Sequence, residues 1–254
     1  MTPLLALDHV TMQFGGVTAL ADVSIHVGVG EIAGLIGPNG AGKTTIFNVV
    51  TGVFSPTEGA VTFAGESIVG RARHEVTKAG IARTFQNIRL FSEMTAVENV
   101  MVGADNHHKT SVFGAALRLP RHRKEEREGR AKAIELLRLV GIADRADDAA
   151  RNLPYGYQRR LEIARALATD PKLVLLDEPA AGFNPNEKRN LSDLIRKVRD
   201  TGYTVLLIEH DMGLVMPLCD RVMVLDFGRK IADGLPKDVQ ADETVIGAYL
   251  GVPT

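Results

Sequence analysis

The stretch Gly37-Pro-Asn-Gly-Ala-Gly-Lys43-Thr44-Thr45 decides the fold of this 254-residue chain. It matches the phosphate-binding pattern G-x-x-x-x-G-K-[ST]. It lies between Glu31–Ile36, an apolar run typical of a strand, and Lys43–Thr51, which has the pattern of a helix. Glycines allow successive backbone N–H groups to converge on phosphate oxygens, and a helix N-terminus adds the positive end of a dipole. The stretch therefore predicts a nucleotide phosphate site made of Gly37, Pro38, Asn39, Gly40, Ala41, Gly42, Lys43, Thr44 and Thr45.

Two side chains of this stretch carry chemistry of their own. We expect Lys43 to reach the β- and γ-phosphates and the Thr44 hydroxyl to bind Mg²⁺. The alternative is an ordinary glycine-rich turn followed by an exposed lysine. The order of strand, loop and helix favours the phosphate site.

A second element is Leu173-Val-Leu-Leu-Asp177-Glu178. Four apolar residues that end in two acids indicate a buried strand whose C-terminal end opens into the site. We expect Asp177 to hold Mg²⁺ through water and Glu178 to orient or deprotonate the attacking water. Such a strand end is common by itself, but its combination with the upstream loop indicates a nucleotide site.

The order of the remaining elements predicts an α/β fold with a largely parallel sheet. Aliphatic and β-branched residues predict strands over Leu4–Phe14, Thr18–Val27, Ala60–Phe63 and Ile81–Phe85. Helical spacing runs from about Ala96 to Ala168, with its clearest stretches at Ala131–Val140 and Tyr157–Ala168. Strands then alternate with helices over Leu173–Leu176, Glu187–Arg199, Thr204–Ile208, a short helix and Arg221–Leu225. We expect one domain over residues 1–254 whose α/β core is interrupted by a helical insertion at approximately 96–170.

The composition is that of an ordinary globular protein, with 45% hydrophobic and 24% charged residues. The 30 Lys and Arg against 31 Asp and Glu leave a net charge of −1, which offers no bulk attraction to nucleic acid. The single cysteine, Cys219, excludes an intrachain disulfide framework and a multi-thiolate metal site. No secretory signal is visible, and no apolar run approaches the roughly 20 residues that span a bilayer.

The segment 107–130 mixes arginines and lysines with glutamates. This charge pattern favours a solvated helix start, with contact to a partner or to lipid headgroups as the alternative. His107 and His108 are adjacent and do not share a helical face, so we do not expect them to bind a metal.

Together with three further positions, these motifs resemble the ATP-binding subunits of ATP-binding-cassette (ABC) transporters, over nearly the whole chain. Gln86 matches the Q-loop glutamine, which binds Mg²⁺ and water in that family. His210, in Ile208-Glu-His210-Asp, matches the switch histidine that contacts the γ-phosphate. Phe14 stands where an aromatic residue usually stacks on adenine, although a core strand position is its alternative. The resemblance implies ATP and Mg²⁺ as cofactors, Thr44, Gln86 and Asp177 at the metal, and catalysis by Glu178, His210 and Lys43.

The same resemblance implies a P-loop NTPase core of the ABC type, with an antiparallel β subdomain and a helical signature subdomain. Two such cassettes dimerise head to tail in the family, and the signature of each completes the partner's ATP site. Here Leu153-Pro-Tyr-Gly156-Tyr stands where the family usually has Leu-Ser-Gly-Gly-Gln. Pro154 offers neither a hydroxyl nor a backbone N–H, Tyr155 replaces a glycine, and Gly156 retains one donor. Asn184 stands at the D-loop, where aspartate is usual.

Softer similarity points to one subgroup, the ATPase subunits of branched-chain amino acid importers. It rests on Phe14-Gly-Gly-Val-Thr-Ala-Leu, Ala82-Arg-Thr-Phe-Gln-Asn, Tyr155–Gly156, Glu178-Pro-Ala-Ala-Gly-Phe-Asn-Pro185 and Ala248-Tyr-Leu-Gly251. The resemblance implies a second, non-identical ATPase subunit (or a second copy of this chain), transmembrane permease subunits and, indirectly, an external solute-binding protein. It also implies a peripheral place on the cytoplasmic side of the inner membrane. We expect Ile88, Leu90, Phe91 and Met94 to face the permease, with local subdomain core as the alternative.

The sequence also allows functions other than amino acid import. The ATPase of a lipopolysaccharide exporter shares the size and compact C-terminus. Soluble ABC proteins of DNA repair carry a long coiled-coil insertion, and those of translation carry two cassettes; one loop in 254 residues fits neither. Pro154 and Asn184 also allow a catalytically inactive binding module. A small GTPase is disfavoured because no Asn-Lys-x-Asp stretch is present.

Overall fold

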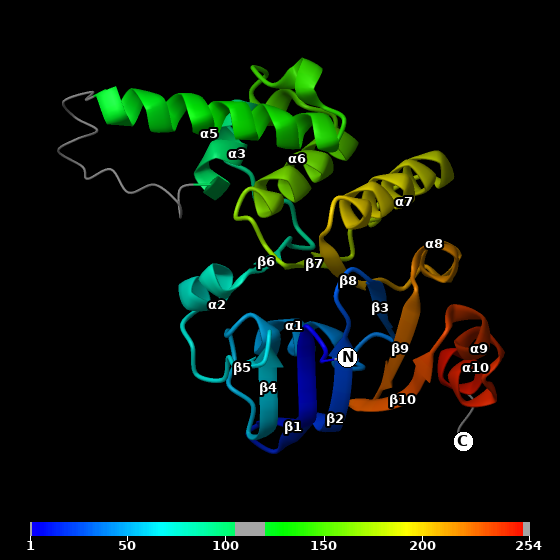
Figure 1. Cartoon of the computed structure of the whole chain (residues 1–254). Helices are drawn as coiled ribbons and strands as arrows, with labels where there is room; N and C mark the ends of the chain where they lie inside the picture. Colours follow the sequence, from blue (N-terminus) through cyan, green and yellow to red (C-terminus); the bar gives the residue numbers. More distant parts are fainter. Residues whose placement is uncertain (1, 105–119, 251–254) are drawn as a thin grey trace. The chain divides into compact units, whose positions relative to one another are not determined.

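The computed structural model describes residues 2–104 and 120–250. The chain forms two compact units: Met1–Arg83 together with Lys172–Thr254, and Thr84–Pro171 (Figure 1). His107 and His108, and with them part of the charged segment 107–130, lie outside the described residues. In the described part of the chain, no helix combines the length and apolar character needed to cross a bilayer.

The first unit contains a six-stranded sheet in the order β10-β9-β3-β8-β7-β6. Its strands are β3 (Ile32–Ile36), β6 (Ile81–Arg83), β7 (Leu173–Asp177), β8 (Thr204–Ile208), β9 (Arg221–Asp226) and β10 (Arg229–Gly234). All neighbours are parallel except the β9–β10 hairpin. Every residue of β3, β7 and β8 is buried, as expected for parallel strands that are covered on both faces. The predicted α/β fold is confirmed.

A second, antiparallel sheet in the same unit has the order β2-β1-β4-β5. Its strands are β1 (Leu5–Phe14), β2 (Val17–Val27), β4 (Glu58–Phe63) and β5 (Glu66–Ser67). One apolar cluster joins side chains of this sheet to β3, β7 and β8 through Ile46 and Phe47 of α1 (Lys43–Val50). Both side chains are fully buried, and each such burial contributes about 1.5–3 kcal/mol. The core therefore packs α1, which begins at the end of the glycine-rich stretch, against side chains of both sheets.

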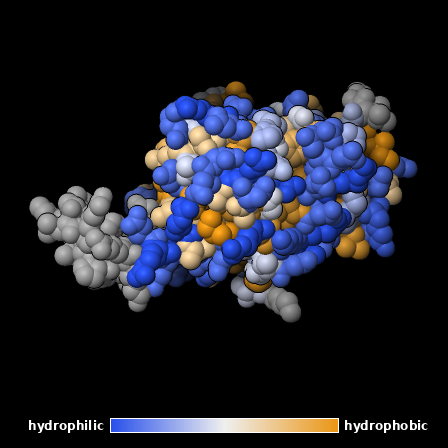
Figure 2. Space-filling view, turned by 90° about the horizontal axis from the view of Figure 1, so that it is seen from above, coloured by the Kyte–Doolittle hydropathy of each residue, from blue (hydrophilic) through white to orange (hydrophobic). Residues whose placement is uncertain are grey.

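The other helices of this unit are α2 (Arg73–Ala79), α7 (Pro185–Asp200), α8 (Met212–Leu218), α9 (Pro236–Ala241) and α10 (Glu243–Leu250). In α7 the apolar residues recur at helical spacing, and Leu191, Leu194, Ile195 and Val198 are all buried. Helices α2, α9 and α10 and strands β5 and β10 have no counterpart in the sequence prediction, because their short segments carry no clear periodicity. Polar side chains cover much of the face in Figure 2, with small apolar areas between them.

The second unit is helical, with α3 (Ala96–Ala104), α5 (Pro120–Leu139), α6 (Tyr155–Leu167) and two short 3₁₀ turns at Ala143–Arg145 and Ala150–Asn152. Several predicted boundaries were off by two residues: β4 begins at Glu58 rather than Ala60, α7 begins at Pro185 rather than Glu187, and two further cases have a visible cause. The strand predicted over Ile81–Phe85 ends at Arg83, because the Phe85 N–H donates to Glu162 of α6 at 3.3 Å instead of joining the sheet. Helix α6 begins at Tyr155, two residues early, because the Pro154 carbonyl accepts the Tyr157 and Gln158 N–H groups at 2.8 and 3.0 Å.

Candidate functional site

Three neighbouring parallel strands of the first unit end at the same edge of the sheet. Strand β3 leads into the glycine-rich loop, β7 ends at Asp177 and Glu178, and β8 leads into Glu209 and His210. The strands are adjacent in the order β3-β8-β7. Ligands of open α/β sheets bind outside the carboxyl ends of the strands, so the topology gathers the predicted chemical groups in one place.

The glycine-rich loop depends on two glycines in the left-handed region, Gly37 at φ 147° and Gly42 at φ 105°. A Cβ at Gly37 would lie 2.1 Å from the Leu225 carbonyl oxygen, and one at Gly42 would lie 2.9 Å from the Ala19 carbonyl oxygen. The Ala41 carbonyl accepts the N–H of Gly228 at 3.0 Å, from the turn between β9 and β10. The backbone at Gly37 and Gly42 therefore lies so close to neighbouring carbonyl oxygens that a residue with a Cβ atom could not take either position.

Lys43 is the first residue of α1 and is only 7% exposed. Its Nζ donates to the carbonyls of Gly37 and Pro38 at 2.7 and 2.8 Å, so the ammonium lies within the loop. Burial lowers the pKa of Lys43, whereas the negative charges of Glu178 and Asp177 oppose that shift. The following residue, Thr44, is exposed, as a hydroxyl that binds a ligand must be.

The carboxylate of Asp177, at the end of β7, is 5% exposed. Its Oδ2 accepts Nη2 of Arg83 at 2.7 Å, while Nη1 of the same guanidinium donates to Asn48 of α1 at 2.8 Å. The guanidinium also lies 5.4 Å from the centroid of the Phe47 ring. The sequence analysis quoted Arg83 within the stretch Ala82-Arg-Thr-Phe-Gln-Asn but gave it no role, because one arginine in a short strand does not reveal which carboxylate it will meet.

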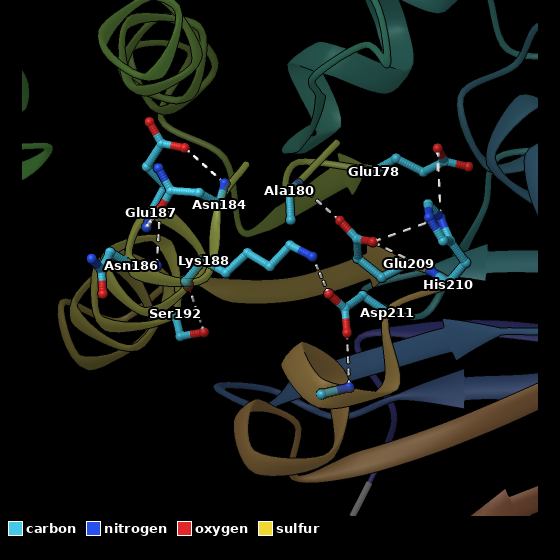
Figure 3. A network of polar contacts seen from close by, with 11 residues as sticks. Glu178, Ala180, Asn184, Asn186, Glu187, Lys188, Ser192, Glu209, His210 and Asp211 are labelled. Carbon is cyan, nitrogen blue, oxygen red and sulfur yellow. Dashed lines mark hydrogen bonds and ion pairs between the residues drawn. The ribbon is translucent and has the colours of Figure 1, made fainter. Parts of the chain in front are cut away.

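Glu178 adopts φ 45°, a left-handed conformation that costs a side-chain-bearing residue about 1–2 kcal/mol. Its N–H donates to the Ile208 carbonyl at 3.0 Å, which anchors the end of β7 to β8. Its Oε2 lies 3.8 Å from Nδ1 of His210 (Figure 3). The His210 side chain is 60% exposed and that of Glu178 is 21% exposed, so both groups are open to a ligand at this edge. Strained backbone of this kind concentrates at functional sites.

Glu209 was also missed, although it directly precedes His210 in the motif. It is 1% exposed, and burial raises the pKa of its carboxyl group while the N–H groups of Ala180 and His210 oppose that shift. Nothing in a single Glu before a histidine distinguishes a buried carboxylate from an exposed one.

Two other predicted positions of this unit have local partners. The Phe14 ring, 40% exposed, makes an edge contact with Phe54 at a centroid distance of 5.0 Å. Asn184 caps α7: its Oδ1 accepts the N–H groups of Asn186 and Glu187 at 2.9 and 3.0 Å, and the Glu187 carboxylate accepts the Asn184 N–H at 2.8 Å. Since an aspartate would cap equally well, the local role of this position survives its replacement by asparagine.

The remaining predicted residues, Gln86, Pro154, Tyr155 and Gly156, belong to the second unit. The carbonyl of Gln86 accepts Nη2 of Arg159 at 2.8 Å, and Arg159 is fully buried in an ion pair with Glu162 at 2.8 Å. Burial raises the pKa of Glu162, and Arg159 opposes that shift. Pro154 is the N-cap residue of α6, and Tyr155 and Gly156 form its first turn. Their N–H groups occupy the helix positions that lack an intrahelical acceptor.

A glycine-rich loop between a parallel strand and a helix, with two acids at the end of a nearby strand, defines a P-loop nucleotide-binding protein. The chain belongs to the ABC transporter ATP-binding proteins: that family's model matches residues 20–181. A second model, described as branched-chain amino acid ATP-binding cassette transporter, matches residues 229–253. Members of the family are ATPases that work as dimers with permease components, so the predicted family and enzyme class are confirmed.

Individual relatives agree with this assignment. The chain is 46% identical to the high-affinity branched-chain amino acid transport ATP-binding protein BraF of Pseudomonas aeruginosa, over 98% of both chains. It is 43% identical to the corresponding protein LivG of Escherichia coli K12, again over 98% of both. Among solved structures, an ATP-binding cassette of an ABC transporter in its ADP conformation matches with a TM-score of 0.86 and 33% identity, over 99% of this chain and 100% of that one.

Proposed function

We propose that this chain is the ATP-hydrolysing subunit of an importer for branched-chain amino acids. The observation that carries ATP hydrolysis is the convergence of the glycine-rich loop, Asp177, Glu178 and His210 on one edge of the sheet. The substrate class is supported by BraF and LivG and by the match of residues 229–253. The two units together form one ATP-binding cassette, residues 1–254, with the helical unit inserted into the α/β core.

Each residue of the edge has a role in this proposal. The loop 37–45 binds the phosphates through backbone N–H groups, and Lys43 contributes the positive charge. Phe14, whose ring is partly exposed, stacks on adenine. Glu178 accepts a proton from the attacking water, and His210, facing it at 3.8 Å, contacts the γ-phosphate. ATP closes the dimer, and loss of the γ-phosphate loosens it again.

The donor set fits Mg²⁺, which prefers oxygen ligands and takes few protein groups beside substrate phosphates. Asp177, Thr44 and Gln86 supply carboxylate, hydroxyl and amide oxygens. When bound, the ion neutralises charge that develops on the phosphates. Arg83 holds the Asp177 carboxylate in place for this role.

The proposed partners are those with which ABC transporter ATP-binding subunits assemble. A second ATPase subunit contributes its signature to the site described above, and this chain returns Pro154, Tyr155, Gly156 and the Asn184 region to the partner's site. Permease subunits dock on the segment after Gln86, where Phe91 is 46% and Met94 37% exposed, whereas Ile88 and Leu90 are half-buried. An external solute-binding protein acts through the permease. The chain lies peripherally on the cytoplasmic side of the inner membrane and binds no nucleic acid.

The alternatives are less well supported. The C-terminal match at residues 229–253 favours the importer over the lipopolysaccharide exporter and over soluble ABC proteins. The complete set of Lys43, Asp177, Glu178 and His210 favours an active ATPase over a binding module.

Purification of the chain with its native partners tests the proposal. We expect two permease subunits and a second ATPase subunit to accompany it. Because transport couples to hydrolysis, the binding protein loaded with leucine, isoleucine or valine is expected to raise the ATPase rate of the complex in lipid nanodiscs. A rate that responds to another solute and to none of these three would contradict the substrate class. The unloaded binding protein is the control.

The altered signature predicts two unequal ATP sites in a heterodimer. The site on this chain's own loop has a complete catalytic set, whereas the opposite site receives Pro154 in place of the serine hydroxyl. Loss of one preorganised phosphate donor costs about 10²–10³-fold in rate. Glu178→Gln in this chain is therefore expected to remove most of the ATPase activity of the complex, and the equivalent change in the partner to remove little. Equal losses, or a functional complex built from two copies of this chain, would exclude the asymmetry.

A further inference from the structure

Glu209 is a buried carboxylate that the proposed roles do not yet use. It follows β8, is 1% exposed, and divides its two oxygens between two loops. Its Oε1 accepts the N–H of Ala180 at 2.8 Å, and its Oε2 accepts the N–H of His210 at 3.2 Å (Figure 3). The same Oε2 lies 4.0 Å from Nδ1 of His210. One side chain thus holds the backbone next to both groups that face the ligand.

The turn that carries Glu178 is attached to the end of β8 at two points. The Glu178 N–H donates to the Ile208 carbonyl at 3.0 Å, and the Ala180 N–H donates to Glu209 at 2.8 Å. Within the turn, the Ala181 N–H donates to the Glu178 carbonyl at 3.2 Å. Two attachments fix the direction of a short turn, whereas one would leave it free to pivot. The second attachment therefore matters for a residue in the strained left-handed region.

A buried carboxylate is costly, because burial penalises its charged form. Hydrogen bonds to the charge offset part of that penalty, as does the nearby His210, and such bonds are about twice as strong as neutral ones. An apolar residue at this position would avoid the cost of burying a charge, but it could not accept the N–H groups of Ala180 and His210. We propose that Glu209 is a positioning residue: its carboxylate, bonded to the Ala180 and His210 N–H groups, sets the spacing between Glu178 and His210. This inference rests on the proposed function, in which these two groups act on the γ-phosphate and the water.

The loop has a second anchor on the other side of His210, which supplies a matched comparison. Asp211 accepts Nζ of Lys188 from α7 at 2.5 Å and the N–H of Gly213 in α8 at 2.9 Å. The Lys188 and Asp211 side chains are 34% and 26% exposed. Partly exposed ion pairs contribute little, and neither hydrogen bond of Glu209 involves this pair, although the charge of Lys188 acts on Glu209 electrostatically. Lys188→Met therefore removes an anchor of the loop without changing what Glu209 holds.

The test compares Glu209→Gln with Lys188→Met in the assembled transporter. The glutamine has the shape of the glutamate, but it has only one acceptor oxygen and presents an NH₂ donor to the other N–H group. We expect kcat to fall about 10²-fold, the scale of a small misplacement of reacting groups. The KM for ATP is expected to change much less than kcat, because the hydrogen bonds of Glu209 go to Ala180 and His210 and not to the loop 37–45 that binds most of the phosphate groups. Glu209→Asp, which keeps the charge but is one methylene shorter, is expected to give an intermediate kcat. Lys188→Met is expected to stay within about twofold of the unaltered protein.

Amide hydrogen exchange in the full-length, nucleotide-free chain gives a readout that does not require hydrolysis. Glu209→Gln is expected to speed exchange at Ala180 and His210, and Lys188→Met to leave both amides protected. Faster exchange together with a kcat equal to that of Lys188→Met would overturn the positioning role, as would protection that persists in Glu209→Gln. A Glu178→Gln variant that still hydrolyses ATP would contradict the proposed function. The hydrogen-exchange result does not depend on that outcome, so the two claims can fail separately.

Discussion

Replacing Glu178 by glutamine is expected to leave ATP binding intact and to lower ATP hydrolysis by roughly 10²–10⁴-fold, the scale for loss of a general base. The carboxylate stands 3.8 Å from Nδ1 of His210 at the open edge of the sheet, where we propose that it activates the attacking water. The amide has the same shape but cannot accept the proton. The backbone at φ 45° is unaffected, since glutamine tolerates this conformation no worse than glutamate. The measurement is single-turnover hydrolysis by the assembled transporter, with nucleotide affinity measured in parallel.

The control is Glu66→Gln, which makes the same chemical change to a carboxylate that is 72% exposed and pairs with Arg71 on the surface. It is expected to hydrolyse ATP at the unaltered rate. Near-normal turnover by Glu178→Gln in a complex whose partner is inactive would remove Glu178 from the role of base.

Replacing Lys43 by alanine is expected to weaken ATP binding by tenfold or more and to abolish transport, while the fold persists. Charge-assisted bonds to phosphate are about twice as strong as neutral ones, and no other ammonium group of the loop can replace this one. The loss to the unliganded protein is expected to be small, because it gives up the bonds from Lys43 to the carbonyls of Gly37 and Pro38 but also removes a charge that burial disfavours. Titration with a fluorescent ATP analogue measures the affinity, and thermal unfolding without nucleotide tests the fold.

Lys230→Ala is the matched control. This lysine lies in the same unit, is partly exposed and pairs with Asp233 at 2.8 Å. Its loss is expected to leave nucleotide affinity unchanged. Tight Mg-ATP binding by Lys43→Ala would contradict the assignment of the loop, and a collapse of unfolding temperature would show that Lys43 acts in the fold instead.

The strands that build the candidate site were predictable because their signals are local. A buried parallel strand is a short run of apolar residues, so β3, β7 and β8 were recognisable within a residue or two. The glycine-rich loop was recognisable because Gly37 and Gly42 adopt positive φ and leave no space for a Cβ. Helix boundaries were less certain: α6 begins at Tyr155 because the carbonyl of a proline, which carries no periodic signal, closes its first turn.

The class of fold could thus be predicted from the residues alone, and the same residues single out the glycine-rich loop, Lys43, Asp177, Glu178 and His210 as the candidate site. Each of these features depends on residues that are close together in the sequence, so their types and spacing form a recognisable pattern. Only the tertiary structure decided which side chains hold those groups in place. Arg83 reaches Asp177 across 94 positions of the chain, and Glu209 reaches Ala180 across 29. Such contacts form only when the fold makes particular strands neighbours. Burial then holds the glutamate or arginine side chain in one geometry, whereas an exposed side chain would stay mobile in solvent.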